Sequence, residues 1–143
     1  MTVAAILLAA GESSRMGTPK PLLEWGGCTL IEYQIAQLKG PTVDRVVVVL
    51  GTRADEVRPA VRRAGARAVI NELYTEGRAS SVRVGAATLG EDTETVLLLN
   101  VDQPRPHRVI ERIVTEHQRQ GSLISVPTFQ GKRGHPPVLS GSL

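Results

Sequence analysis

The chain has 143 residues, of which 41% are hydrophobic and only 3% aromatic, so its core must be built from aliphatic side chains. A formal charge of +3, without dense basic clusters or interleaved aromatics, argues against a nucleic-acid-binding surface and suits a small anionic ligand. The N-terminal apolar stretch is too short to span a membrane and lacks a basic leader, and the single Cys28 excludes an intramolecular disulfide. We therefore expect one cytoplasmic domain over residues 1–143, with no membrane or nucleic-acid partner.

Patterns typical of strands and helices alternate along the chain. Continuous apolar or β-branched runs predict buried strands at residues 3–9, 45–50, 66–70, 95–100 and 123–126. Apolar residues at helical spacing predict helices between Thr29 and Gly40, between Thr52 and Gly65, from the serines at 80–81 to Leu89, and from Pro106 to Gln120. Such alternation implies an α/β fold with a mostly parallel sheet and right-handed crossovers.

Capping and breaking residues set the expected helix ends. Thr29 and Glu32 form a capping box at the start of the first helix. One of Ser80 and Ser81, which follow a glycine-bearing loop, is expected to cap the third helix, and Pro106 suits the first position of the fourth. Pro59 lacks a backbone donor, so the second helix should start late or kink.

The stretch from residue 8 to residue 20 directly follows the first strand and predicts a phosphate-binding loop. Small side chains at Ala9, Ala10 and Gly11 allow backbone N–H groups to point at an anion, and Arg15 and Lys20 add full positive charges. Ligands of parallel sheets bind beyond the carboxyl ends of the strands. The loop should therefore share one rim of the sheet with the residues that follow the fourth predicted strand.

This loop departs from the two best-known phosphate-binding patterns. A P-loop requires a lysine directly after its second glycine, but Thr18 follows Gly17 and the lysine comes at position 20. A dinucleotide-binding fingerprint requires a second glycine where Ser13 stands, and an acid after the second strand, which instead ends in Leu50-Gly51-Thr52.

The same stretch matches Leu-Ala-Ala-Gly-x-Ser-x-Arg-Met-Gly-x-x-Lys, a nucleotidyltransferase signature, at every specified position. Further matching segments are Lys20-Pro21-Leu22-Leu23, Asn71 with Glu76-Gly77 and Ser80-Ser81-Val82, Asp102-Gln103-Pro104, and Gly134-His135-Pro136. With these segments the chain resembles the molybdenum cofactor cytidylyltransferases and the related guanylyltransferases. The resemblance implies a Rossmann-like three-layer α/β/α fold of the nucleotide-diphospho-sugar transferase type.

The resemblance also implies roles for individual residues. Arg15 and Lys20 would neutralise the triphosphate and the leaving pyrophosphate, while Asp102 would coordinate Mg²⁺, a hard cation that prefers oxygen ligands. Asp102 has an alternative role as a helix cap. His135 is expected to be structural rather than a substrate contact. The full predicted nucleotide-binding set is Leu8, Ala9, Ala10, Gly11, Ser13, Ser14, Arg15, Lys20, Gly77 and Ser81.

The implied activity is Mg²⁺-dependent transfer of CMP from CTP to the phosphate of a molybdopterin-type cofactor, with release of pyrophosphate. The Ala-Ala-Gly form of the loop resembles the cytidylyl group more than the guanylyl group. The alternatives are a guanylyltransferase, a sugar-phosphate nucleotidyltransferase, and a non-catalytic nucleotide-binding accessory module.

The resemblance breaks at the C-terminal end. Family members usually continue well past this point, often with a second acidic metal ligand, whereas no acid follows Glu116 here. Three explanations stay open: a naturally short member that uses one acid and water, a truncated form, and a chain completed by a partner subunit in a homo-oligomer.

Overall fold

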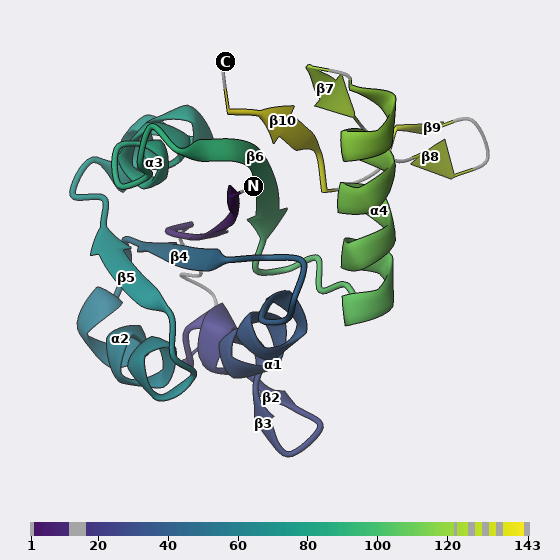
Figure 1. Ribbon diagram of the computed structural model, residues 1–143. Helices are drawn as coiled ribbons and strands as arrows, with labels where there is room; N and C mark the ends of the chain where they lie inside the picture. Colours follow the sequence, from purple (N-terminus) through teal and green to yellow (C-terminus); the bar gives the residue numbers. More distant parts are fainter. Residues whose placement is uncertain are drawn as a thin grey trace.

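The computed structural model describes residues 2–11, 17–121, 123–125, 128–129, 132–133 and 136–141. In this part of the chain a six-stranded sheet has the order β5-β4-β1-β6-β10-β7 (Figure 1). Its strands are β1 (Thr2–Ala9), β4 (Arg45–Leu50), β5 (Arg67–Ile70), β6 (Thr93–Asn100), β7 (Ile124–Ser125) and β10 (Val138–Ser140). The first four strands in that order are mutually parallel, whereas β10 runs antiparallel to β6 and to β7.

Helices cover both faces of this sheet. They are α1 (Leu30–Leu38), α2 (Ala54–Arg63), α3 (Arg78–Ala86) and α4 (His107–Gln120), with short 3-10 turns η1 (Lys20–Leu22) and η2 (Tyr74–Glu76). Two small hairpins pair β2 (Glu24–Trp25) with β3 (Cys28–Thr29) and β8 (Thr128–Phe129) with β9 (Lys132–Arg133). The expected α/β fold with a mostly parallel sheet is therefore confirmed. Within the described residues, no helix is both long and apolar enough to cross a membrane.

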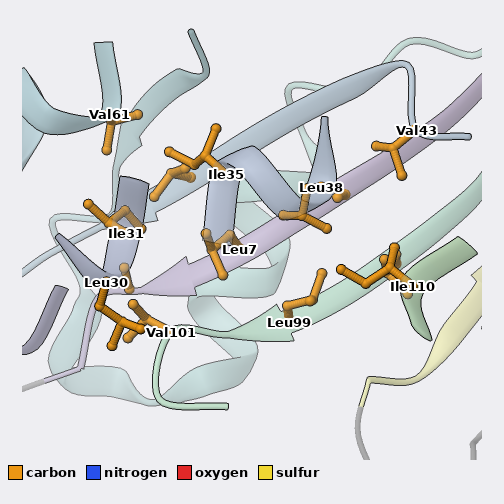
Figure 2. Packing of buried hydrophobic residues seen from close by; sticks show 14 of the residues in the cluster. Leu7, Leu30, Ile31, Ile35, Leu38, Val43, Val61, Leu99, Val101 and Ile110 are labelled. Carbon is orange, nitrogen blue, oxygen red and sulfur yellow. The ribbon is translucent and has the colours of Figure 1, made fainter. Parts of the chain in front are cut away.

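Alternation along β1 divides the core into two layers, because successive side chains of a strand point to opposite faces. Leu7 of β1 and Leu99 of β6 belong to the cluster with α1, α2 and α4, where Ile35 and Ile110 are fully buried (Figure 2). Ile6 and its neighbours on the other face pack against α3. Gly85 permits this close approach, since a Cβ there would lie 2.8 Å from Ile6 Cγ2.

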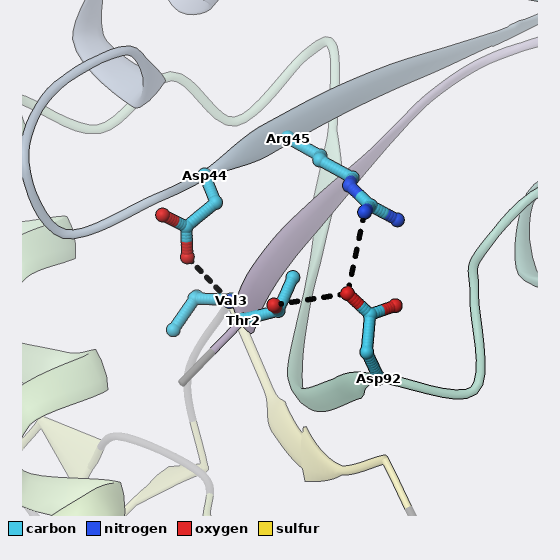
Figure 3. Close-up of polar contacts among 5 residues, drawn as sticks. All are labelled: Thr2, Val3, Asp44, Arg45 and Asp92. Atoms are coloured by element: carbon cyan, nitrogen blue, oxygen red, sulfur yellow. Dashed lines mark hydrogen bonds and ion pairs between the residues drawn. The ribbon is translucent and has the colours of Figure 1, made fainter.

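Polar contacts fix the amino ends of the central strands (Figure 3). The backbone N–H of Val3 donates to Asp44 Oδ2 at 2.8 Å, and Asp92 Oδ2 accepts from Thr2 Oγ1 and from Arg45 Nη2 at 3.3 Å each. These side chains lie just before or at the start of their strands. They connect the amino ends of β1, β4 and β6 and leave the carboxyl ends of these strands free of these contacts.

The structure corrects several predicted helix ends. The third helix begins at Arg78 with Gly77 as its N-cap, makes no side-chain cap hydrogen bond, and ends at Ala86. Serine capping was wrong here because the hydroxyls of Ser80 and Ser81 bond elsewhere. Pro106 has extended backbone angles and is the N-cap of α4, so the helix begins one residue later than predicted. The second helix runs from Ala54 to Arg63 with Pro59 inside it, so a late start was also wrong.

The predicted strands are present in the structure, but one further strand of the sheet was not predicted. The first four predicted strands appear within two residues of their expected ends, and β7 is shorter than predicted. Strand β10 was not predicted at all, because a segment of three residues is too short to show a strand pattern. It inserts between β6 and β7 and makes the sheet mixed rather than purely parallel.

Candidate functional site

A cleft of about 350 Å³ lies at the carboxyl ends of β1 and β6, bounded by η1, η2 and the start of α3. This is the rim on which ligands of parallel sheets bind. The cleft is lined by Leu8, Ala9, Ala10, Gly11, Lys20, Pro21, Tyr74, Gly77, Arg78, Ser81, Asn100, Val101 and Asp102. It thus brings together the predicted site residues that the structure describes, although they come from four separate stretches of the chain.

Lys20 and Asp102 place opposite charges at this cleft. Lys20 begins η1, Asp102 lies in the turn after β6, and their Nζ and Oδ2 atoms are 4.0 Å apart. The two side chains are 42% and 55% exposed, so water screens the pair and their attraction contributes little to stability. Both charges are therefore accessible to a ligand. The alternative role of Asp102 as the cap of α4 was wrong, since Pro106 caps that helix without any side-chain bond.

The end of β1 forms the narrow wall of the cleft. Ala9 and Ala10 are buried there, and the N–H of Val101 donates to Leu8 O at 3.1 Å, which aligns the ends of β1 and β6. Gly51, directly after β4, packs against Ala10 of this wall and against Tyr74. A Cβ at Gly51 would lie 2.8 Å from Ala10 O and 2.7 Å from Tyr74 Cβ, so the close packing requires glycine.

The amino end of α3 forms the opposite wall. Gly77 has φ +104°, a backbone conformation that favours glycine, and it turns the chain from η2 into the helix. Free backbone N–H groups and the helix dipole make such a terminus attractive to anions and other hydrogen-bond acceptors. Ser81 lines the cleft one turn into the helix, and it is 4% exposed.

The prediction from sequence missed Arg78 and Asn100, which also line the cleft. Arg78 is the first residue of α3, and its Nε donates to Asn100 Oδ1 at 3.3 Å. Asn100 ends β6, and its backbone carbonyl accepts from the buried Gln34 at 3.2 Å. One signal was available for each residue: Arg78 directly follows Gly77, and Asn100 stands at a strand end on the predicted rim.

Arg53 anchors the far end of the predicted phosphate-binding loop. Its Nη1 donates to Gly17 O at 3.0 Å, and Glu56 forms an ion pair with its guanidinium. The hydrogen bond from Arg53 holds the pKa of Glu56 below its usual value. Ser13, Ser14 and Arg15, predicted to bind the nucleotide, lie outside the described residues, as does His135.

The residues of the cleft fit a magnesium ion in one particular way. Among the described residues, no group of three or more His, Cys, Asp or Glu side chains gathers to hold a metal ion. Asp102 is a hard, accessible carboxylate ligand at the cleft. Magnesium is commonly bound through one or two carboxylates together with water and substrate phosphates, so a single acid suits it when a phosphate ligand is also bound.

Comparison with known proteins agrees with this geometry. Residues 5–143 match the family model of the MobA-like NTP transferase domain. The chain belongs to this family. It is therefore a member of a nucleotidyltransferase enzyme family, as the loop signature indicated.

Two curated relatives cover nearly the whole chain. Nicotine blue oxidoreductase of Paenarthrobacter nicotinovorans is 32% identical over 149 residues, which cover 99% of the chain and 72% of that protein. Molybdenum cofactor cytidylyltransferase of Escherichia coli is 30% identical over 136 residues, covering 94% of the chain and 68% of that protein. By contrast, the chain spans 30% of the bifunctional protein GlmU of Pelobacter propionicus, to which it is 31% identical.

Solved structures share the fold. A nucleotidyl transferase from Methanothermobacter thermautotroptrophicus superimposes with a TM-score of 0.84 at 26% identity, covering 99% of the chain and 72% of that structure. Rv0371c from Mycobacterium tuberculosis, solved in complex with manganese, gives a TM-score of 0.80 at 26% identity with the same coverage.

Proposed function

We propose that the chain is a cytidylyltransferase that transfers CMP from CTP to the phosphate of a molybdopterin-type cofactor. The observation that supports this most is the meeting of Lys20 and Asp102 at a cleft whose walls are Ala9, Ala10 and the amino end of α3. Phosphoryl transfer requires a cationic side chain, an acidic metal ligand and a backbone that the phosphates can approach closely.

In this reaction an oxygen of the acceptor phosphate forms a bond to the α-phosphorus of CTP. The bond from that phosphorus to the bridging oxygen breaks, and pyrophosphate leaves with the electron pair. Negative charge is crowded along the whole path, so positioning and charge neutralisation dominate catalysis. Lys20, together with Arg15 of the same loop, would neutralise the triphosphate and the leaving pyrophosphate.

Asp102 would hold Mg²⁺ in this proposal. When bound, the ion supplies positive charge to phosphate oxygens that one lysine cannot neutralise alone. The backbone of Ala9, Ala10 and Gly11 would support the nucleotide on one side, and Gly77 and Ser81 would contact its base or ribose on the other.

The choice of CTP and of the acceptor goes beyond family membership. The relatives carry names as different as an oxidoreductase and a cytidylyltransferase, so the shared domain does not determine the substrate. The Ala-Ala-Gly form of the loop and the cytidylyltransferase of Escherichia coli as a relative covering 94% of the chain support cytidine.

Pyrophosphate release tests this function. Purified chain with Mg²⁺ and a molybdopterin-type cofactor should release pyrophosphate from CTP, and each pyrophosphate should be matched by one cytidine dinucleotide product. Release from GTP instead would favour the guanylyltransferase alternative. Tight triphosphate binding without any pyrophosphate would overturn transfer and favour the non-catalytic binding module.

A further inference from the structure

A buried polar cluster lies behind the wall of the cleft, where Asn71 meets two serines of α3. Asn71 is 2% exposed, and its Nδ2 donates to Ser80 Oγ and to Ser81 Oγ at 2.9 Å each. Its Oδ1 accepts from the N–H of Leu73 at 3.0 Å, which fixes the orientation of the amide. Both amide protons of Asn71 are therefore committed to the two hydroxyl oxygens.

The two serines differ in where their own protons go. Ser80 Oγ lies 2.8 Å from Gly77 O and 3.1 Å from Leu73 O, so its proton is donated inward to the backbone. Ser81 Oγ also accepts from Asn71, but within the described part of the chain its own proton has no hydrogen-bond acceptor. Ser81 lines the cleft, so its hydroxyl proton is free to point into the cleft.

We propose that Asn71 is a positioning residue that makes Ser81 a hydrogen-bond donor toward the bound nucleotide. This inference rests on the proposed function. Because the Asn71 amide already donates to Ser81 Oγ, the hydroxyl proton of Ser81 is the group left to bond with a ligand atom that accepts. The nucleotide group that this proton meets is therefore an acceptor, namely a carbonyl, a ring nitrogen or a ribose oxygen.

This polarity favours a pyrimidine such as cytosine, whose O2 and N3 are both acceptors. Guanine presents the N1–H and N2–H2 donors at the positions where cytosine presents N3 and O2, and these donors cannot accept the Ser81 proton. Rejection of a mismatched polar edge is the stronger form of specificity, because it leaves buried polar groups without partners. Asn71, which itself lies outside the cleft, thus contributes to base choice through Ser81.

A double-variant cycle on CTP affinity tests the inference. The variants are Asn71→Asp, whose side chain cannot donate two hydrogen bonds, Ser81→Ala, and the two combined. The melting temperature of each variant is measured. Asn71→Asp offers the Ser81 proton an acceptor away from the cleft, and Ser81→Ala removes the hydroxyl itself. Each single variant should therefore weaken CTP binding by about fivefold to tenfold. The combined variant should bind CTP within about twofold of Ser81→Ala alone, because Asn71 acts through Ser81. The loss should appear in KM for CTP, with kcat retained.

Ser80→Ala is the matched control, since it loses the same kind of bond to Asn71 without facing the cleft. It should keep CTP affinity within about twofold of the unmodified chain. Losses from Asn71→Asp and Ser81→Ala that multiply in the pair would overturn the inference. If Asn71→Asp does not fold, the two serine variants decide alone, because equal losses from Ser80→Ala and Ser81→Ala would also overturn it. Failure of the unmodified chain to bind CTP would instead reject the proposed function on which the inference rests.

Discussion

Lys20 and Asp102 are close enough to interact, yet each remains about half exposed. A pair of this kind contributes at most about 1 kcal/mol to folding, because water screens the charges and two side chains lose freedom. Their placement is better explained by a ligand that needs both charges than by a need for stability.

Replacement of Lys20 by alanine should weaken CTP binding by roughly tenfold or more, because a charge-assisted bond to phosphate is lost. The melting temperature should stay unchanged. Lys39→Ala is the control, since Lys39 donates to Ala64 O outside the cleft. Titration calorimetry and thermal melts measure both quantities. A large fall in melting temperature with normal CTP affinity would show that Lys20 is structural.

Replacement of Asp102 by asparagine should raise the Mg²⁺ concentration needed for half-maximal activity, because the amide is a much weaker ligand for a hard cation. The folded state should be retained, since the side chain is 55% exposed and caps no helix. A Mg²⁺ titration of pyrophosphate release checks this result. An unaltered titration curve would remove Asp102 from the metal site.

Single residues differ in how well sequence predicted their place. Lys20, Asp102, Gly77 and Ser81 belong to motifs, and all of them line the cleft. Asn71 was recognised as part of a motif, but only the three-dimensional contacts show that its amide bonds both serines. Hydrogen bonds between side chains depend on rotamers, which spacing along the chain does not report.

At the scale of elements, helix α1 has the predicted capping box between Thr29 and Glu32. Thr29 Oγ1 accepts from the N–H of Glu32 at 3.2 Å, and its hydroxyl donates to Glu32 Oε1 at 2.8 Å. The bond from Thr29 is the main cause of a lowered pKa for Glu32. Helix α3, in contrast, has Gly77 as its N-cap and no side-chain cap, because the hydroxyls of Ser80 and Ser81 bond to Asn71. Capping rules thus fail where tertiary hydrogen bonds engage the same side chains.

Thr29→Ala should lower the free energy of unfolding by about 1 kcal/mol, because the N–H of Glu32 loses its acceptor. Thr29→Ser keeps the hydroxyl and should restore most of that loss. Urea unfolding should show a lower midpoint with an unchanged slope. Equal stability of the alanine and serine variants would contradict the capping role.

At the scale of the whole molecule, the two ends of the parallel strands have different roles. Hydrogen bonds of Asp44 and Asp92 and the ion pair between Asp92 and Arg45 hold the amino ends of the strands, while the cleft lies at their carboxyl ends. This division was predictable, because alternation of strands and helices specifies a parallel sheet and hence a single rim for ligands. The antiparallel β10 was not, because a strand so short depends on tertiary contacts rather than on its own pattern.

Folding stability should also depend on pH through His117. This histidine is 4% exposed on α4, its Nδ1 lies 2.6 Å from Ser125 Oγ, and burial lowers its pKa below 6.5. The unfolded chain therefore binds the proton more readily, so the free energy of unfolding should fall as pH drops below 6.5. Unfolding at pH values from about 7.5 to 5.5 measures it. A His117→Gln variant should lose less stability over this range, and an identical loss would assign the effect to other groups.

The central claim is that the carboxyl-edge cleft binds CTP, and a calorimetric titration of the unmodified chain with CTP and then with GTP, both with Mg²⁺, tests it most directly. We predict saturable binding of one CTP per chain, with GTP bound more weakly. No detectable binding of CTP, or binding of GTP as tight as that of CTP, would contradict the account.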